Sequence, residues 1–149
     1  MDALRNAEYL CCLAANAGVA VSVDAVQEVF ESRQITRLPG CPPWVAGMAN
    51  LRGSVVPVLN PWGLPAPGGA IKKIVVLKTA EGPVGLLITR LIDLMRFEKF
   101  GECGAPPRPL DGSGDVFDAM AESAEGVGFL LLNVEQMIAG TLSQLARKG

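Results

Sequence analysis

Residues 39–60 read PGCPPWVAGMANLRGSVVPVLN, and this stretch decides the fold class. Two mostly apolar runs, 44–50 and 55–60, flank a short polar turn at 52–54. A glycine in the turn supplies the positive φ that a tight hairpin needs, and short apolar runs bounded by turn residues are typical of strands. The stretch therefore predicts a β-hairpin. Because Pro57 donates no backbone hydrogen bond, the return strand is expected at an edge or a bulge there.

Similar apolar runs lie on both sides of this hairpin. The patterns predict strands at 8–15, 19–23, 34–38, 73–79, 84–88 and 128–133, with 116–121 either strand or helix. Helical spacing predicts a short helix capped by Asp24, in which Val26, Val29 and Phe30 share a face. The same spacing predicts a helical turn through Ile88, Leu91, Ile92 and Met95, and residues 135–147 predict a C-terminal helix. The chain is therefore expected to be mostly β with a few short helices.

Two pairs of segments repeat each other's pattern of apolar positions. Residues 23–30 match 88–95, and residues 56–60 match 129–133. Such repetition indicates two related β-rich halves.

The composition limits the classes of function. The 149 residues are enough for one domain with its own core, and 50% hydrophobic against 19% charged residues argues against disorder. A net charge of -2 excludes a strongly basic nucleic-acid surface. We find neither a signal peptide nor an apolar run of membrane-spanning length, so we expect a cytoplasmic protein with no direct membrane insertion.

Catalytic and metal-binding chemistry has little support in this sequence. Histidine is absent, and the four cysteines, Cys11, Cys12, Cys41 and Cys103, form no Cys-x-x-Cys pair. We expect reduced thiols, with Cys11 and Cys12 on opposite faces of a strand, and neither a metal site nor a cofactor. The rival classes are a small enzyme using carboxylates such as Asp115 and Asp118, and a purely structural β-barrel module.

The stretch from residue 39 to residue 60 also resembles the signature of the CheW-like family, Pro-Gly followed by Gly-x-x-Asn-Leu-Arg-Gly-x-x-x-Pro-Val. The resemblance extends to Val26–Val29, Val84–Ile88 and Leu130–Glu135. It implies one CheW-like domain over residues 1–149, with two small five-stranded SH3-like β-barrels. The expected barrels are roughly 18–72 plus the chain end, and roughly 73–135.

The resemblance implies a non-enzymatic adaptor that couples the cytoplasmic tip of methyl-accepting chemoreceptors to a CheA-type histidine kinase. Receptors of the family bind between the barrels with the tip of a helical hairpin, and kinases pair barrel to barrel through their regulatory domain. Other CheW-like proteins are further candidate partners. The residues expected to bind partners are Asn50, Arg52, Gly53, Val56, Val58 and Val84.

Several of these residues have a structural alternative. Arg52 and Gly53 can simply form a tight turn, and Asn50 can satisfy backbone groups. Trp44 fits a core position and an interface position equally well.

One segment departs from the family pattern. Residues 61–65, Pro-Trp-Gly-Leu-Pro, stand where the family usually has a short helix, and proline and glycine disfavour a helix. The alternative function is therefore a specialised motility-reversal adaptor of the gliding or frizzy type. Such a protein would bind a receptor or another adaptor without binding the kinase directly.

Overall fold

The computed structural model describes residues 7–14, 17–32, 34–37, 39–40, 45–60, 72–101, 117–134 and 137. These residues form eleven strands and a 3-10 turn, η1, at Val23–Ala25, and Val134 and Met137 are helical. The mostly β prediction is confirmed. Among the described residues, no helix is long and apolar enough to cross a bilayer.

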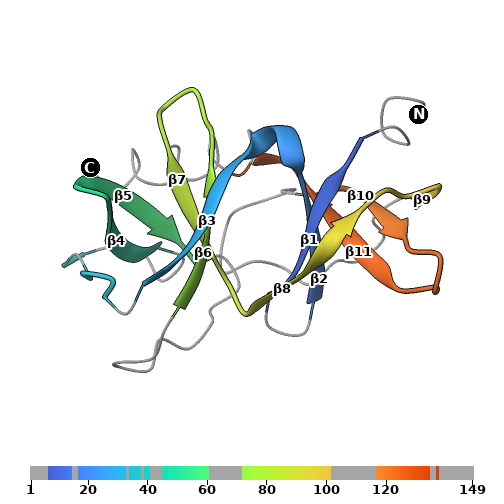
Figure 1. The fold of residues 1–149 in the computed structure, drawn as a ribbon, viewed down its shortest axis with the longest axis horizontal. Coiled ribbons are helices and arrows are strands. Elements are labelled where there is room, and N and C mark those ends of the chain that lie inside the picture. The colour runs from blue at the N-terminus through green and yellow to red at the C-terminus, as the bar shows by residue number, and fades with distance from the viewer. Residues whose placement is uncertain are drawn as a thin grey trace.

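The strands form two sheets that lie side by side (Figure 1). The first, which we call the terminal barrel, has the order β8-β1-β2-β11-β10-β9. Its strands are β1 Tyr9–Ala14, β2 Ala17–Ser22, β8 Arg90–Met95, β9 Lys99–Gly101, β10 Phe117–Glu122 and β11 Gly128–Leu132. The second, the central barrel, has the order β3-β6-β7-β5-β4. Its strands are β3 Val26–Ser32, β4 Val45–Leu51, β5 Ser54–Leu59, β6 Lys72–Leu77 and β7 Val84–Ile88.

The two barrels exchange one strand each. β3 follows the β1–β2 hairpin along the chain but pairs with β6, whereas β8 follows the β6–β7 hairpin but pairs with β1. The terminal barrel therefore takes its strands from residues 9–22 and 90–132, and the central barrel from 26–88. This membership differs from the expected division into roughly 18–72 plus the chain end and roughly 73–135, because a nearly linear division of the sequence cannot represent an exchange of strands.

The internal repeat of the sequence corresponds to equivalent strands. β5 pairs in parallel with β7, and β11 pairs in parallel with β2, whereas every other pairing is antiparallel. Residues 56–60 and 129–133 thus cover most of β5 and β11, the two strands that each run parallel to one strand of a buried hairpin. The terminal barrel has six strands, not five, because the three-residue strand β9 extends its sheet.

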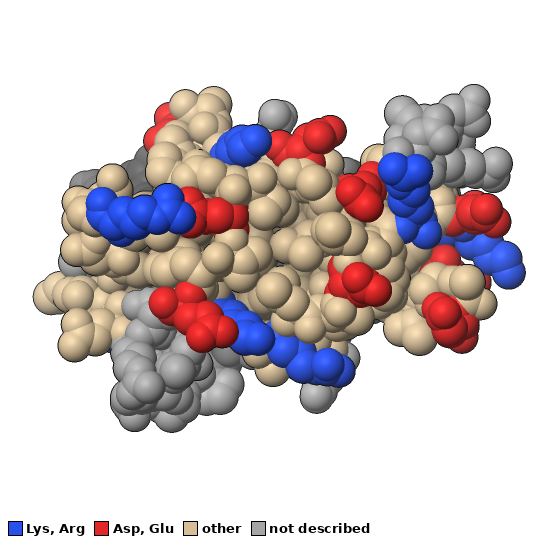
Figure 2. Space-filling model, in the orientation of Figure 1, with Lys and Arg blue, Asp and Glu red and all other residues tan. Residues whose placement is uncertain are grey.

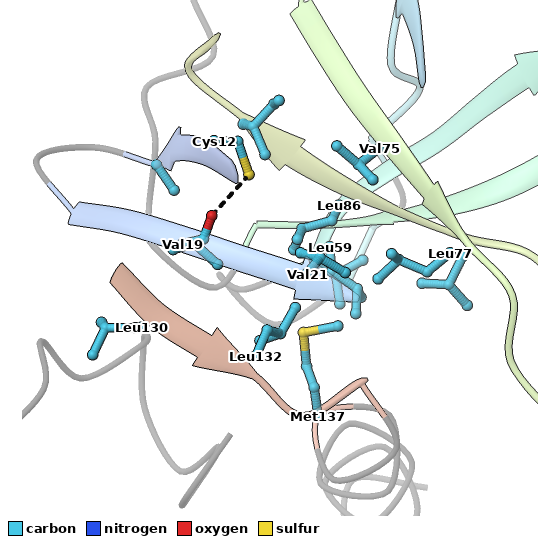
Figure 3. Close-up of a cluster of buried hydrophobic side chains, with 14 residues drawn as sticks. Cys12, Val19, Val21, Leu59, Val75, Leu77, Leu86, Leu130, Leu132 and Met137 are labelled. Atoms are coloured by element: carbon cyan, nitrogen blue, oxygen red, sulfur yellow. Dashed lines mark hydrogen bonds between the residues drawn. The ribbon is translucent and has the colours of Figure 1, made fainter. Parts of the chain in front are cut away.

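Three clusters of buried apolar side chains explain why most strands are apolar on both faces. One cluster lies within the terminal barrel and one within the central barrel. The third, which we call the central cluster, joins the two sheets and includes Cys12, Val19, Leu86 and Leu132 (Figure 3). Since both faces of the β1–β2 and β6–β7 hairpins are covered, these hairpins are the hydrophobic centre of the molecule.

Both predicted internal helices are wrong, and one local feature explains both errors. β3 has a register shift between Val26 and Glu28, and β8 has one between Leu91 and Asp93. A bulge inserts one extra residue, so side chains three apart, not two apart, return to the same face. The bulged strands therefore imitate the spacing of a helix.

The remaining predictions have mixed outcomes. Of the predicted strand 34–38, the described residues 34–37 contribute an isolated bridge between Thr36 and Met48, and residues 117–122 form a strand. Pro57 is not on an edge strand, but the parallel pairing of β5 with β7 begins only at Val58. Cys41, Trp44, residues 61–65, Cys103, Asp115 and most of the predicted helix 135–147 lie outside the described residues.

Candidate functional site

The tip of the β4–β5 hairpin brings together three of the expected site residues. Arg52 and Gly53 form the turn, with φ values of 49° and 88°, and the backbone amide of Gly53 donates a hydrogen bond of 2.8 Å to Asn50 Oδ1. This contact supports the structural alternative for Asn50, because its side chain satisfies the turn. Two consecutive residues with positive φ are the arrangement of a tight two-residue hairpin, for which Asn-Gly is the favoured sequence.

Arg52 is an unusual choice for the first position of this turn. It is the only non-glycine residue with positive φ among the described residues, and such a conformation costs an L-residue about 1–2 kcal/mol. Its side chain is 76% exposed and forms an ion pair with Glu28 on β3. The backbone would favour asparagine or glycine here, so the guanidinium accounts for the presence of arginine.

Gly47, which was not among the expected site residues, allows the central barrel to close. Thr36 and Met48 exchange two backbone hydrogen bonds of 2.8 Å, which join the segment after β3 to the edge strand β4. A Cβ on Gly47 would lie 2.2 Å from the carbonyl oxygen of Thr36, at a φ of 143°. Only glycine permits this approach, and a glycine inside an otherwise apolar strand was the available signal.

The three expected valines do not form an exposed surface. Val56 and Val58 are fully buried and Val84 is nearly so. Val58 belongs to the cluster inside the central barrel, whereas Val84 belongs to the central cluster on the other face of the sheet. These side chains support the hairpin from beneath, and a partner cannot reach them without opening the core.

One apolar surface that a partner can reach lies where the two barrels meet. Leu10 of β1, Val26 and Val29 of β3 and Leu91 of β8 are half-buried and pack against the central cluster. We call these four residues the seam. β8 extends the apolar surface with Ile92 and Leu94, which are 37% and 50% exposed. In Figure 2, uncharged atoms cover much of the middle of this face, and many of the charged side chains lie toward its rim.

The described cysteines are buried structural thiols. Cys11 and Cys12 are both free and point into different clusters, as expected for neighbours on a strand. Cys12 Sγ donates to the carbonyl oxygen of Val19 at 3.6 Å (Figure 3). Burial raises the pKa of each thiol to about 12, and the nearby carboxylate of Asp93 adds to the rise for Cys11. Thiols held protonated in this way are poor nucleophiles and poor metal ligands.

Among the residues that the structure describes, no three His, Cys, Asp or Glu side chains lie together as metal ligands would. The arrangement at the hairpin tip and the seam provides exposed apolar and charged groups on rigid strands. Such groups are suited to binding another macromolecule.

Known proteins share this architecture. The chain matches the family model of the CheW-like domain over residues 8–141. It is 33% identical over 98 residues to chemotaxis protein CheW of Thermotoga maritima, an alignment that covers 64% of this chain and 65% of that protein. The scaffolding protein TtCheW from Thermoanaerobacter tengcongensis has the same fold, with a TM-score of 0.70 over 86% of this chain and 84% of that chain, at 16% identity. The matched region and the strand arrangement agree, and the chain belongs to the CheW-like family.

Proposed function

We propose that this chain is a non-enzymatic adaptor that couples methyl-accepting chemoreceptors to a CheA-type histidine kinase in the cytoplasm. The observation that carries the proposal is the apolar surface formed by the seam together with Ile92 and Leu94. Exposed apolar patches on rigid strands mark binding sites for other proteins. The tip of a helical hairpin offers apolar side chains of the matching kind.

The receptor surface in this proposal differs from the one expected from sequence. Val56, Val58 and Val84 are replaced by the seam and by the exposed residues of β8, because the three valines are buried whereas the residues of the seam and of β8 are at least partly accessible. Asn50 and Gly53 set the turn geometry, and Arg52 remains as the exposed residue at the hairpin tip. Arg52 lies at the tip of the β4–β5 hairpin. We assign this end of the central barrel to binding the kinase or another CheW-like protein.

A matched pair of variants tests the receptor surface. Leu94→Glu places a charge on β8, whereas Val127→Glu makes the same kind of change at a residue of nearly equal exposure, 53% against 50%, on the β10–β11 turn. Calorimetry with the cytoplasmic fragment of a chemoreceptor should show at least a tenfold weaker affinity for Leu94→Glu and little change for Val127→Glu. Equal affinities for both folded variants and the unchanged protein would contradict the proposed surface.

The specialised motility-reversal adaptor remains the second candidate, and it depends on residues 61–65, which the structure does not describe. The two functions differ in one measurement, namely binding to the isolated regulatory domain of the kinase. Micromolar or tighter binding supports the coupling adaptor. Receptor binding without measurable kinase binding supports the specialised adaptor.

A further inference from the structure

The two exchanged strands are equivalent in detail, and their equivalence allows the barrels to be compared residue by residue. β3 and β8 each lie at the end of a sheet, beside the first strand of a buried hairpin. In β3 the bulge places Gln27 between Val26 and Glu28, and in β8 it places Ile92 between Leu91 and Asp93. Glu28 and Asp93 are therefore corresponding acids, each directly after the extra residue of a bulge.

The two acids differ in what they bind. Glu28 forms an ion pair with Arg52, which the β4–β5 turn extends toward it. Asp93 is exposed, and its carboxylate accepts a 2.8 Å hydrogen bond from the backbone amide of the next residue, Leu94. Within the described part of the chain, no lysine or arginine forms an ion pair with Asp93.

The corresponding hairpin of the terminal barrel cannot supply the missing cation. The β10–β11 turn also contains a glycine with positive φ, Gly126 at 84°, as the β4–β5 turn contains Gly53 at 88°. The residue before Gly126 is Glu125, where the other turn has Arg52. The β10–β11 turn, residues 123–127, is longer than the β4–β5 turn and contains no lysine or arginine, so this barrel keeps the acceptor without the donor.

We propose that Asp93 receives an arginine side chain from the bound receptor segment, as Glu28 receives Arg52 within the chain. The inference rests on the proposed function and specifies the partner: a segment that carries an arginine beside apolar side chains. Ile92 and Leu94, the neighbours of Asp93 in the chain, are exposed and supply the apolar contact. Asp93 pairs in register with Cys11 and Leu94 with Leu10, so their side chains lie on opposite faces of the sheet. Because β8 is the end strand of its sheet, a partner along its free side reaches side chains on both faces.

The electrostatic part of this contact should depend on salt. An arginine–carboxylate pair that forms only in the complex strengthens binding, and screening by ions weakens it. The apolar part should not weaken in the same way. The ionic-strength dependence of the affinity therefore separates the contribution of Asp93 from that of Ile92 and Leu94.

The test measures binding of the full chain to the cytoplasmic fragment of a chemoreceptor at low and high salt. Asp93→Asn should weaken binding about tenfold at low salt and should flatten the salt dependence. The matched control is Glu81→Gln, which removes an exposed acid from the β6–β7 turn and should change neither quantity. Asp93→Arg should weaken binding more than Asp93→Asn. A receptor fragment in which one arginine is changed to aspartate should regain binding to the Asp93→Arg variant, and to no other form of the protein.

The outcomes separate this inference from the proposed function. If the unchanged protein binds and Asp93→Asn binds equally well with the same salt dependence, the role of Asp93 is wrong and the proposed function stands. If the unchanged protein binds no receptor fragment, both are wrong. Thermal unfolding of each variant checks that the fold is retained, as expected for an exposed residue.

Discussion

The two barrels close in different ways. In the central barrel, the edge strand β4 meets the segment after β3 through the backbone bridge of Thr36 and Met48, and the ion pair of Arg52 and Glu28 joins the hairpin tip to β3. In the terminal barrel, the two end strands β8 and β9 follow each other in the chain and are joined by residues 96–98. The central barrel is thus closed by contacts between residues distant in sequence. The terminal barrel is closed by the chain itself at residues 96–98, which we call the corner.

The apolar cores of the two barrels also differ. The corner of the terminal barrel contributes Phe97, which is almost fully buried and has its ring centroid 5.6 Å from those of both Tyr9 and Phe129. The cluster inside the central barrel is mostly aliphatic and small, with Ala49, Val58, Ile74 and Leu87 at its centre. The comparison indicates that the terminal barrel depends on large side chains, and the central barrel on close backbone approach.

The largest expected effect tests the aromatic corner. Phe97→Ala removes a buried ring that pairs with three others, those of Tyr9, Phe100 and Phe129, and such truncations cost about 3–5 kcal/mol of the free energy of unfolding. Phe100→Ala is the control, because Phe100 is only half-buried and its loss should cost less. Urea unfolding measures both. A loss below about 1 kcal/mol for Phe97→Ala would show that the corner does not hold this barrel.

The next effect tests backbone approach in the central barrel. Gly47→Ala places a Cβ against the Thr36 carbonyl, which must move, and we expect a loss of about 1–3 kcal/mol or failure to fold. Gly53→Ala has a similarly unfavourable φ but no atom within 4 Å of the added Cβ, so its loss should be smaller. Equal losses in urea unfolding would mean that φ alone, and not the barrel closure, explains why glycine is needed at both positions.

The third prediction concerns the buried thiols, which lie in the terminal barrel and in the central cluster. Both pKa values are raised from 9.0 to about 12, so the unfolded chain loses these protons at lower pH than the folded one. The folded state is therefore favoured below pH 9, and its stability should fall as the pH rises from about 9 toward 12. Urea unfolding at pH 8 and pH 10.5 measures the fall. The double variant Cys11→Ala, Cys12→Ala should show a smaller fall, and an unchanged fall would contradict the assignment to these thiols.

Much of the fold was predictable from local patterns, and the errors have a physical cause. The hairpins were visible because apolar runs and turn residues are signals within a few residues of each other. β3 and β8 were mistaken for helices because their bulges give apolar residues a helical spacing. The exchange of these strands between barrels depends on pairing partners far apart in sequence, which no local pattern records.

The site was predictable only in part, for a similar reason. The turn at Arg52 and Gly53 follows from two adjacent residues, whereas its ion-pair partner Glu28 lies 24 residues earlier. Burial of Val56 and Val58 was also hidden, because an apolar strand residue can face either a core or a partner. The exposure of Leu94 depends on β8 being the end strand of its sheet, which is again a property of the assembled fold.

The smallest expected effect separates the two contributions at the hairpin tip. Arg52→Asn removes an exposed ion pair, which is worth about 0.2–1 kcal/mol. The same change relieves the backbone, because asparagine tolerates the positive φ of this position better than arginine does. The two changes oppose each other, so the free energy of unfolding should stay within about 0.5 kcal/mol of the original. Glu28→Gln removes the same ion pair without relieving the backbone, so it should be the less stable of the two variants.

The difference between these variants therefore estimates the backbone cost of arginine at this turn. If Arg52→Asn were instead clearly less stable than Glu28→Gln, the ion pair would not be the main contact of the guanidinium, and Arg52 would have a structural role beyond it. If the expected order holds, stability does not explain the arginine, in agreement with the proposed binding of partners at this end of the central barrel. Affinity for the kinase regulatory domain should then fall for Arg52→Asn while its unfolding curve stays nearly unchanged.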